Sequence, residues 1–415
     1  MGRGQRGRIP LSNPMGVVPL RRNKQFQLLW VGSAVSQVGM ELTRLATPLL
    51  VLALTGSPGW AGIVAGARTA ASVMAQLPAG VWVDRWDRRR TLIAVQGLQT
   101  VNAAVLAALI VGDRALVWHF VVTAVIDGGC AAFLRPTRTT AIRGVVPTEQ
   151  LPNAYAQEQA RLHAARLIGP PLGALLYGLG RAVPFVVDAV TFLVAALCAA
   201  GAKVPRRPKS EPGGRRSMRR DMGEAVAWLW RQRGLRAVWA VVMMLNLLSP
   251  AYLLPLIVLV GERGGGALGT GTVLAGAGIG GLVGALLSGR VGRLLPPGKL
   301  TIVFTAVFGA SIVAMALPFG PWWPMGPLVL FSLTMPAFNV VTSVVIARLA
   351  PEEMLGRVDA VLTAAGFGLS PLGPVLGGAL AAALGGAGSI VLIGGLMLLT
   401  AAGAALSGDL RRFSG

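Results

Sequence analysis

Twelve long apolar runs in the sequence restrict the possible folds more than any other feature. The chain is 54% hydrophobic and 13% charged, and each run is long enough to cross a hydrocarbon core of ~30 Å as a helix. A transmembrane β-barrel is excluded, because its strands would be ~10-residue segments of alternating polarity. We therefore expect an all-α integral membrane protein. The runs are 26–54, 60–83, 91–111, 116–134, 155–179, 184–202, 237–260, 271–291, 300–317, 323–347, 358–384 and 390–406.

Basic residues fall almost entirely in alternate loops between these runs. Thirty-one of the 38 Lys and Arg residues lie in the two tails and the loops on one side, whereas only Arg114, Arg181 and Arg263 lie on the other. This asymmetry predicts that both termini lie in the cytoplasm. Arg greatly outnumbers Lys, and Ala, Gly and Val are abundant, which hints at a bacterium, so the expected location is a bacterial inner or plasma membrane. The net charge of +22 therefore indicates topology and anionic lipid neighbours, and does not indicate nucleic acid.

The second half of the chain repeats the first at an offset of 204 residues, which aligns Gly169-Pro170 with Gly373-Pro374 and Gly80 with Gly284. A parallel duplication of six spans predicts two six-helix bundles. The expected domains are a basic tail at 1–25, bundles at 26–202 and 237–406, a cytoplasmic linker with an amphipathic helix at 203–236, and a tail at 407–415.

Several ionisable side chains fall inside the predicted spans of the first half. Each costs at least ~2.5 kcal/mol to insert, so each needs a partner or a wet cavity. Glu41 and Arg44 are three residues apart and therefore share one helix face. These side chains are candidates for a proton or substrate pathway, and static ion pairs are the alternative. The set is Glu41, Arg44, Arg68, Asp127, Glu158, Arg161, Arg166 and Asp188, with Gln37, Gln96, Gln99 and Asn102 expected to extend a wet interior.

A short charged segment joins the second and third spans with the pattern Gly-x-x-x-Asp-Arg-x-x-Arg-Arg, formed by Gly80, Asp84, Arg85, Arg88 and Arg89. It resembles the loop between the second and third helices of major facilitator superfamily transporters, where Gly is commoner at the position of Asp87. The resemblance implies a conformational switch, and an ordinary positive-inside loop is the alternative.

By that resemblance Asp84 would dock against the N-terminus of the eleventh helix near Gly356. Either Arg135 or Arg138, at the end of the fourth helix, would hold its other oxygen.

Two stretches inside the fifth and eleventh spans combine glycine with proline. They are Gly169-Pro170-x-x-Gly173 and Gly373-Pro374-x-x-Gly377-Gly378. They resemble the Gly-Pro motif in the fifth helix of superfamily exporters. Close packing of small residues, without any role in transport direction, is the alternative.

Further segments look like the enterobactin-exporter-like branch of this superfamily, also called transmembrane secretion effectors. They are 36–44 followed by Pro48, the run 188–192 and Gly356-Arg357-Val358. The branch implies efflux of a small organic molecule, such as a drug, siderophore or secondary metabolite, in exchange for protons. The chain departs from the exporters in the fourth span, where no Arg precedes the Gly-rich stretch after Asp127.

Other functional classes find little support in the sequence. Gly298-Lys299-Leu300 fails the spacing of a nucleotide-binding loop, so an ion gradient is the expected energy source. No nucleophile can be placed with a His, and Cys130 and Cys198 lie in apolar spans, so we expect no enzyme, cofactor or metal site. A monomeric exporter is the preferred hypothesis; a proton-coupled importer and a non-transporting receptor or regulator are the alternatives.

Overall fold

The structure is a computed structural model that describes residues 19–204, 227, 231–291, 296–349 and 366–411. Helices form nearly all of these residues. Within these ranges no strand occurs, and eight helices are long and apolar enough to cross a membrane by length and composition. The elements are α1 Lys24–Thr55, α2 Pro58–Arg85, α3 Arg88–Val111, α4 Val117–Val145, η1 Thr148–Gln150, α5 Leu151–Leu179, α6 Val183–Gly201, α8 Arg233–Ala251, α9 Leu253–Glu262, α10 Gly266–Val291, α11 Pro297–Met315, α12 Met325–Leu349, α14 Leu372–Leu406 and α15 Gly408–Arg411.

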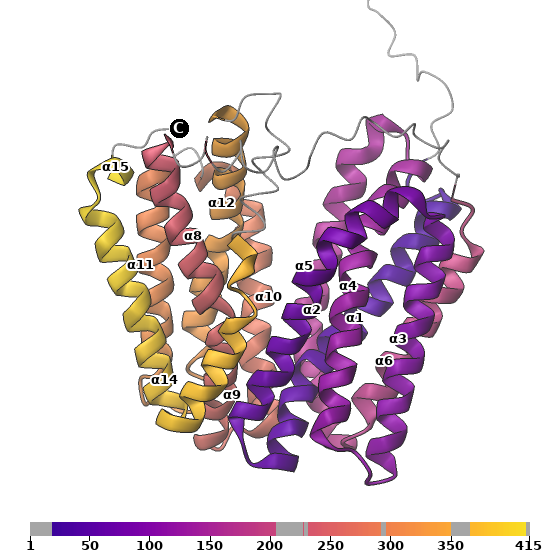
Figure 1. Ribbon diagram of the computed structural model, residues 1–415, viewed down its shortest axis with the longest axis horizontal. Coiled ribbons are helices and arrows are strands. Elements are labelled where there is room, and N and C mark those ends of the chain that lie inside the picture. The colour runs from indigo at the N-terminus through magenta and orange to yellow at the C-terminus, as the bar shows by residue number, and fades with distance from the viewer. Residues whose placement is uncertain (1–18, 205–226, 228–230, 292–295, 350–365, 412–415) are drawn as a thin grey trace, which may run out of the picture.

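The helices form two bundles that stand side by side (Figure 1). In the first, α1 packs against α5 and α6, and α2 packs against α4; in the second, α14 packs against α8, α9 and α11, and α10 packs against α12. In the second bundle, α8 and α9 together form one membrane-crossing unit, and α14 forms two because it merges two helices. The described residues therefore form six membrane-crossing units, here called rods, in each bundle. The predicted all-α fold with two six-helix bundles is confirmed.

Three of the predicted spans are interrupted or joined in ways that backbone chemistry explains. The seventh span breaks into α8 and α9 at Tyr252, two residues after Pro250, because proline lacks the amide donor that a continuous helix requires. The eleventh and twelfth spans follow one another without a loop and bend at Gly385, whose φ of 68° favours glycine.

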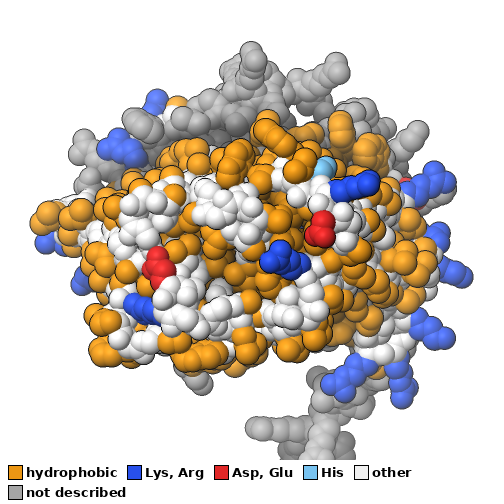
Figure 2. Space-filling model, turned by 90° about the horizontal axis from the view of Figure 1, so that it is seen from below, with side chains coloured by type: hydrophobic (Ala, Val, Ile, Leu, Met, Phe, Trp, Pro, Cys, Tyr) orange, Lys and Arg blue, Asp and Glu red, His pale blue; other side chains and the backbone are white. Residues whose placement is uncertain are grey.

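The two ends of the molecule differ in charge. We call the end where α1 begins and α2 ends the basic end; among its described residues are Lys24, Arg89, Lys203 and Arg411. It lies at the top of Figure 1. Figure 2 views the opposite end, where hydrophobic and uncharged side chains cover most of the face.

The bundles contact one another near the opposite end. There α2 packs against α14, and α5 packs against α10. A hydrophobic cluster crosses the same boundary, joining Leu50 and Val64 of the first bundle to Leu254 and Ile257 of α9. The molecule is therefore closed at the opposite end.

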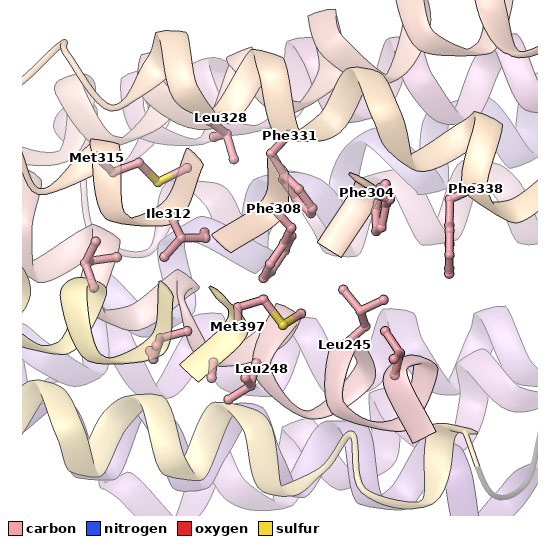
Figure 3. Close-up of a cluster of buried hydrophobic side chains, with 14 of the residues drawn as sticks. Leu245, Leu248, Phe304, Phe308, Ile312, Met315, Leu328, Phe331, Phe338 and Met397 are labelled. Atoms are coloured by element: carbon pink, nitrogen blue, oxygen red, sulfur yellow. The ribbon is translucent and has the colours of Figure 1, made fainter. Parts of the chain in front are cut away.

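The core of the second bundle is a large hydrophobic cluster rich in aromatic rings (Figure 3). Phe304 stacks on Phe338 with ring centroids 4.5 Å apart, and Phe308 meets Phe331 edge to face at 4.4 Å. Dispersion contacts of this kind hold helices together where lipid removes most of the hydrophobic driving force.

The fourth helix is longer than the apolar run that predicted it. The run ends at Leu134, whereas α4 continues to Val145, so Arg135, Arg138 and Arg143 lie on its final turns. Apolarity marks where a helix leaves the hydrocarbon, and a helix can continue beyond that point. The amphipathic helix expected in the linker falls almost entirely outside the described residues.

Candidate functional site

A cleft between the two bundles consists of two adjoining chambers that share lining residues. The first, about 540 Å³, lies between α1, α2 and α4 on one side and α8, α9 and α14 on the other. The second, about 730 Å³, lies between α1 and α5 on one side and α10 and α12 on the other. We call them together the central cleft. Both chambers are lined by Arg44, Arg166, Ser249, Tyr252 and Leu253.

The central cleft extends toward the basic end. The second chamber is lined by Gln159, two turns after the start of α5, and by Ser288, in the last turn of α10. Both residues lie near the basic end of their helices. At the opposite end, the contacts of α2 with α14 and of α5 with α10 separate the cleft from the exterior. Among the described residues, the cleft is thus closed at the opposite end and extends toward the basic end.

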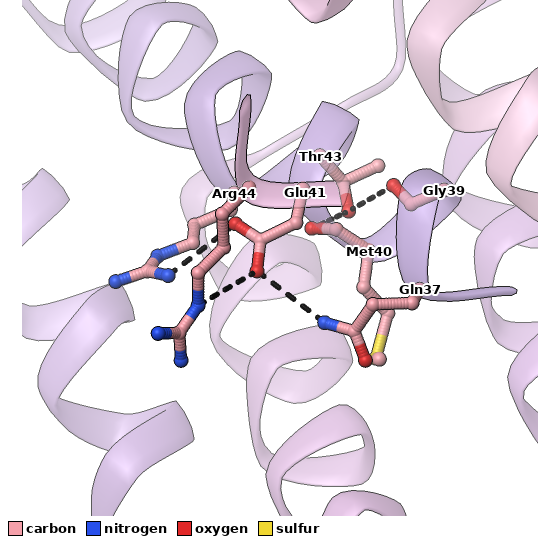
Figure 4. A network of polar contacts seen from close by, with 7 residues as sticks. Gln37, Gly39, Met40, Glu41, Thr43 and Arg44 are labelled. Carbon is pink, nitrogen blue, oxygen red and sulfur yellow. Dashed lines mark hydrogen bonds and ion pairs between the residues drawn. The ribbon is translucent and has the colours of Figure 1, made fainter. Parts of the chain in front are cut away.

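Glu41 is the centre of a polar cluster at the wall of the cleft (Figure 4). Its side chain accepts a hydrogen bond from Gln37 Nε2 at 3.3 Å and pairs with Arg44 Nη1 at 3.3 Å. Arg166 of α5 approaches the same carboxylate, with Nε 4.0 Å from Oε1. Glu41 itself is buried, whereas about half of the Arg44 and Arg166 side chains is exposed to the cleft.

Close approach of helices holds Glu41 in place. A Cβ on Gly169 of α5 would collide with Glu41, and a Cβ on Gly173 would lie 2.8 Å from the carbonyl oxygen of Leu42. The first Gly-Pro stretch therefore brings α5 against α1 at the carboxylate. The second stretch does the same in its own bundle, where a Cβ on Gly373 would lie 2.5 Å from the carbonyl oxygen of Leu247 on α8.

The same stretches also contact the other bundle. The carbonyl oxygen of Pro170 faces Gly271 of α10, and that of Pro374 faces Gly62 of α2. A Cβ on Gly378 would lie 2.6 Å from the carbonyl oxygen of Pro58 at the start of α2. Small residues thus allow both bundle-to-bundle contacts at the closed end.

Asp127 lines the first chamber from α4. Its Oδ1 accepts a hydrogen bond from Asn102 Nδ2 at 3.1 Å, and Arg68 of α2 interacts with it electrostatically. Arg68 also lines this chamber. Asp127 and Arg68 are therefore the charged residues that face the first chamber from α4 and α2.

Asp188 of α6 is buried within the first bundle and does not line either chamber. Its Oδ2 accepts a hydrogen bond from Thr43 of α1 at 3.1 Å, and Thr191 donates to its backbone oxygen at 2.7 Å. A Cβ on Gly39 would collide with both Asp188 and Thr191, so glycine lets α1 approach α6 here.

Glu158 and Arg161 form a buried ion pair on α5, with Nη2 2.7 Å from Oε2. Arg161 also donates to the carbonyl oxygen of Ser33 on α1 at 2.8 Å. Arg138 reaches into the same bundle and lines a small cavity beside Ser33 and Gln96. These side chains brace helices and do not line the central cleft.

The polar residues expected to extend a wet interior behave differently from one another. Gln37 binds Glu41 and Asn102 binds Asp127. Gln96 and Gln99 are buried inside the bundle and line neither chamber. Gln96 lines a small separate cavity, and the wet interior expected around these two glutamines stays a prediction.

The charged loop forms a turn in which Asp87 caps α3. Its side chain accepts a hydrogen bond from the Arg90 amide at 2.9 Å, so Asp87 starts the next helix where glycine is commoner in the family. Arg88 donates to the carbonyl oxygen of Thr140 on α4 at 3.0 Å, and Arg89 donates to that of Ala200 on α6. Gly80 lies on α2 with open space beside it. The side chains of Asp84 and Arg85 and all of Gly356 lie outside the described residues.

Sequence reasoning did not single out Tyr252 and Ser249, which line both chambers from the second bundle. Tyr252 stands at the break between α8 and α9, and its ring meets Phe331 edge to face at 6.1 Å. Pro250 inside an apolar run was the available signal, because discontinuous helices often carry binding sites in transporters.

The described residues contain no group of three or more His, Cys, Asp or Glu side chains that could hold a metal ion. The residues of the cleft instead offer guanidinium, carboxylate, hydroxyl and amide groups. Such groups can bind and release a solute, and the carboxylates can also take up and release a proton.

Comparison with known proteins agrees with this arrangement. The chain is 28% identical to the "Multidrug efflux pump Tap" of Mycobacterium tuberculosis over 88% of both chains, and 23% identical to the "Enterobactin exporter EntS" of Salmonella typhi over 95% of both. A relative of the enterobactin-exporter branch is thus among the matches, as the sequence segments predicted.

Solved structures share the fold. A bacterial homolog of the human lysosomal transporter Spinster, in an inward-facing and unoccupied conformation, matches with a TM-score of 0.72 at 16% identity, covering 96% of this chain and 98% of that one. The nucleoside transporter NupG matches with a TM-score of 0.69 at 13% identity, covering 92% of this chain and 98% of that one. The family model of the Major Facilitator Superfamily matches residues 29–369. The chain therefore belongs to the Major Facilitator Superfamily and is a multi-pass membrane transporter, not an enzyme.

Proposed function

We propose that the protein exports a small organic molecule by alternating access, with the proton gradient as its energy source. The observation that carries this proposal is the central cleft, which is bounded by both bundles, extends toward the basic end and is closed at the other. A cleft at the interface of two repeats is where such transporters bind their substrates.

The export direction rests on the relatives. The M. tuberculosis relative is named as an efflux pump and the Salmonella relative as an exporter. The "Macrolide efflux protein A" of Streptococcus pyogenes is 24% identical over 52% of this chain. We propose a substrate of the drug, siderophore or secondary-metabolite type.

The proposed orientation places the basic end, and with it both termini, in the cytoplasm of a bacterial cell membrane. Anionic lipids would neighbour the basic residues at that end. The proposed domains are bundles at 26–202 and 237–406 with a cytoplasmic linker between them, and the proposed assembly is a monomer.

Proton coupling requires an acid that water can reach from each side in turn. Glu41 and Asp127 both line the central cleft, whereas Asp188 does not and is bound by hydroxyl groups. We propose Glu41 as the proton carrier, with Asp127 as its competitor, and Asp188 as a brace between α1 and α6.

Transport into inverted vesicles tests direction and coupling together. Two xanthene dyes of opposite charge, carboxyfluorescein and rhodamine 6G, serve as probes. We expect at least one dye to accumulate when the lumen is acidic and to stop accumulating when a protonophore is added. Accumulation in right-side-out vesicles only would support the importer, uptake that ignores the pH gradient would refute proton coupling, and no movement of either dye would support a non-transporting protein.

The proton carrier is identified in the same vesicles with Glu41→Gln. Proton-driven transport should be lost while dye exchange without a pH gradient is retained. If both processes survive, the role passes to Asp127, and Asp127→Asn is the matched variant.

A further inference from the structure

The central cleft carries an excess of positive charge. Of the described residues that line it, four are arginines and two are carboxylates: Arg44, Arg68, Arg135, Arg166, Glu41 and Asp127. Positive charge without a counter-ion is costly inside a membrane protein, so the excess of arginines over carboxylates leaves the described cleft electrostatically incomplete. A solute that brings negative charge would complete it.

Most of these guanidiniums also have unused hydrogen-bond donors. Within the described part of the chain, Arg68, Arg135 and Arg166 donate no hydrogen bond, although each guanidinium has five N–H groups. Arg135 and Arg44 lie close enough to Arg166 to interact with it electrostatically. Like charges held together around a cavity, with free donors, suit an acceptor-rich anion.

Glu41 shows which group fits between two of them. Its single carboxylate has Arg44 Nη1 3.3 Å from one oxygen and Arg166 Nε 4.0 Å from the other. These two guanidiniums come from different helices, α1 and α5, and about half of each side chain faces the cleft. The exposed half of each guanidinium side chain can therefore contact a second carboxylate that enters the cleft.

Among the described residues, the facing wall of the second bundle contributes neutral polar groups and no charged side chain. Asn246, Ser249 and Tyr252 line the cleft from α8 and the break that follows it. Arg44 and Arg166 both interact electrostatically with Tyr252. The second bundle can thus contact the uncharged remainder of a solute while the first bundle holds its charged group.

We propose that the transported molecule is an organic anion whose carboxylate or similar oxyanion binds between Arg44 and Arg166, in competition with Glu41. This proposal deepens the proposed efflux function and rests on it for the statement that the bound molecule is transported. Contact of Glu41 with a cationic substrate is disfavoured, because the arginines occupy that carboxylate.

Binding to the purified full chain in lipid nanodiscs provides the test, with carboxyfluorescein as the anionic probe and rhodamine 6G as the cationic probe. Anisotropy should show tighter binding of carboxyfluorescein to the unmodified protein. Arg166→Gln should weaken that binding about 10-fold to 100-fold, the range expected for a lost charge-assisted contact, and Arg166→Lys should weaken it less. Arg114→Gln, an exposed site at the opposite end, is the control and should change nothing.

Glu41→Gln distinguishes an effect on binding from an effect on folding. It removes the competing charge, so it should strengthen carboxyfluorescein binding about tenfold. A misfolded variant could not gain affinity. Unchanged carboxyfluorescein binding in both Arg166→Gln and Glu41→Gln would overturn the proposal, as would tighter binding of rhodamine 6G to the unmodified protein.

The vesicle measurement keeps this inference distinct from the proposed function. If vesicles transport rhodamine 6G alone and ignore the arginine variants, export stands and the anionic class is refuted. If the nanodisc result is as expected but vesicles transport neither dye, the anion site stands and the transport function is refuted.

Discussion

A Cβ atom on Gly271 of α10 would lie 2.7 Å from the carbonyl oxygen of Pro170 on α5. The related contact in the repeat is equally tight, because a Cβ on Gly62 of α2 would lie 2.6 Å from the carbonyl oxygen of Pro374 on α14. Both contacts join the two bundles at the closed end. A glycine in one bundle against a proline carbonyl in the other is thus a paired feature of the closed state.

Larger side chains at these glycines should prevent closure. We expect Gly62→Val and Gly271→Val to shift the protein toward the state open at the opposite end, since the carbonyl oxygens belong to backbone that cannot move aside cheaply. A cysteine introduced by Ser249→Cys, in the cleft, would then react with an impermeant thiol reagent from that side. Gly178→Val is the control, because nothing lies within 4 Å of a Cβ there. Labelling equal to that of the control would contradict the account.

Topology is testable with two exposed positions, in a background lacking Cys130 and Cys198. Arg114 follows α3 at the opposite end, and Lys203 follows α6 at the basic end. In intact cells an impermeant thiol reagent should label the variant Arg114→Cys and spare Lys203→Cys, because the basic end is expected in the cytoplasm. The reverse pattern would invert the orientation.

The buried pair of Glu158 and Arg161 should contribute to stability. Removing one partner leaves an uncompensated charge, so Arg161→Met should destabilise the protein by about 3–5 kcal/mol. The double variant with Glu158→Gln should cost less than the two single changes together. Thermal unfolding in detergent measures this, with Glu149→Gln, an exposed change on η1, as the control. Strict additivity would show that the pair is not coupled.

Asp84 tests the loop between α2 and α3. Docking of its carboxylate on a helix N-terminus would stabilise that contact by ~0.3 to 1 kcal/mol, or more if partly buried. Asp84→Asn removes the charge, so it should lower dye transport while the amount of protein in the membrane stays near normal. Asp113→Asn, which changes an exposed carboxylate at the opposite end, should leave transport unchanged. Full transport activity of Asp84→Asn would show that Asp84 has no role in the switch and belongs to an ordinary loop between spans.

Local sequence rules account for a definite part of the candidate site. The spacing of Glu41 and Arg44 predicted one helix face, and the two side chains lie 3.3 Å apart. The contribution of Arg166 to the same carboxylate depends on how α5 packs on α1, which no local pattern specifies. The same holds for Asp188, whose partner Thr43 lies on another helix.

Apolarity predicted the membrane-crossing rods better than their ends. The apolar run of the fourth span ends at Leu134 although α4 continues to Val145, because a hydropathy pattern follows the hydrocarbon and not the backbone hydrogen bonds of the helix. The break at Tyr252 had a local signal in Pro250, but its position beside both chambers depends on the packing of two bundles.

The central claim is that substrate moves through the cleft between the bundles. Ser249 lines both chambers, so a thiol introduced at this position can carry a bulky group into the path. Dye transport into inverted vesicles should be normal for Ser249→Cys in a background lacking Cys130 and Cys198. It should stop after reaction with a bulky methanethiosulfonate reagent and return after reduction. Unchanged transport with the introduced thiol fully modified would contradict the claim that the cleft is the path.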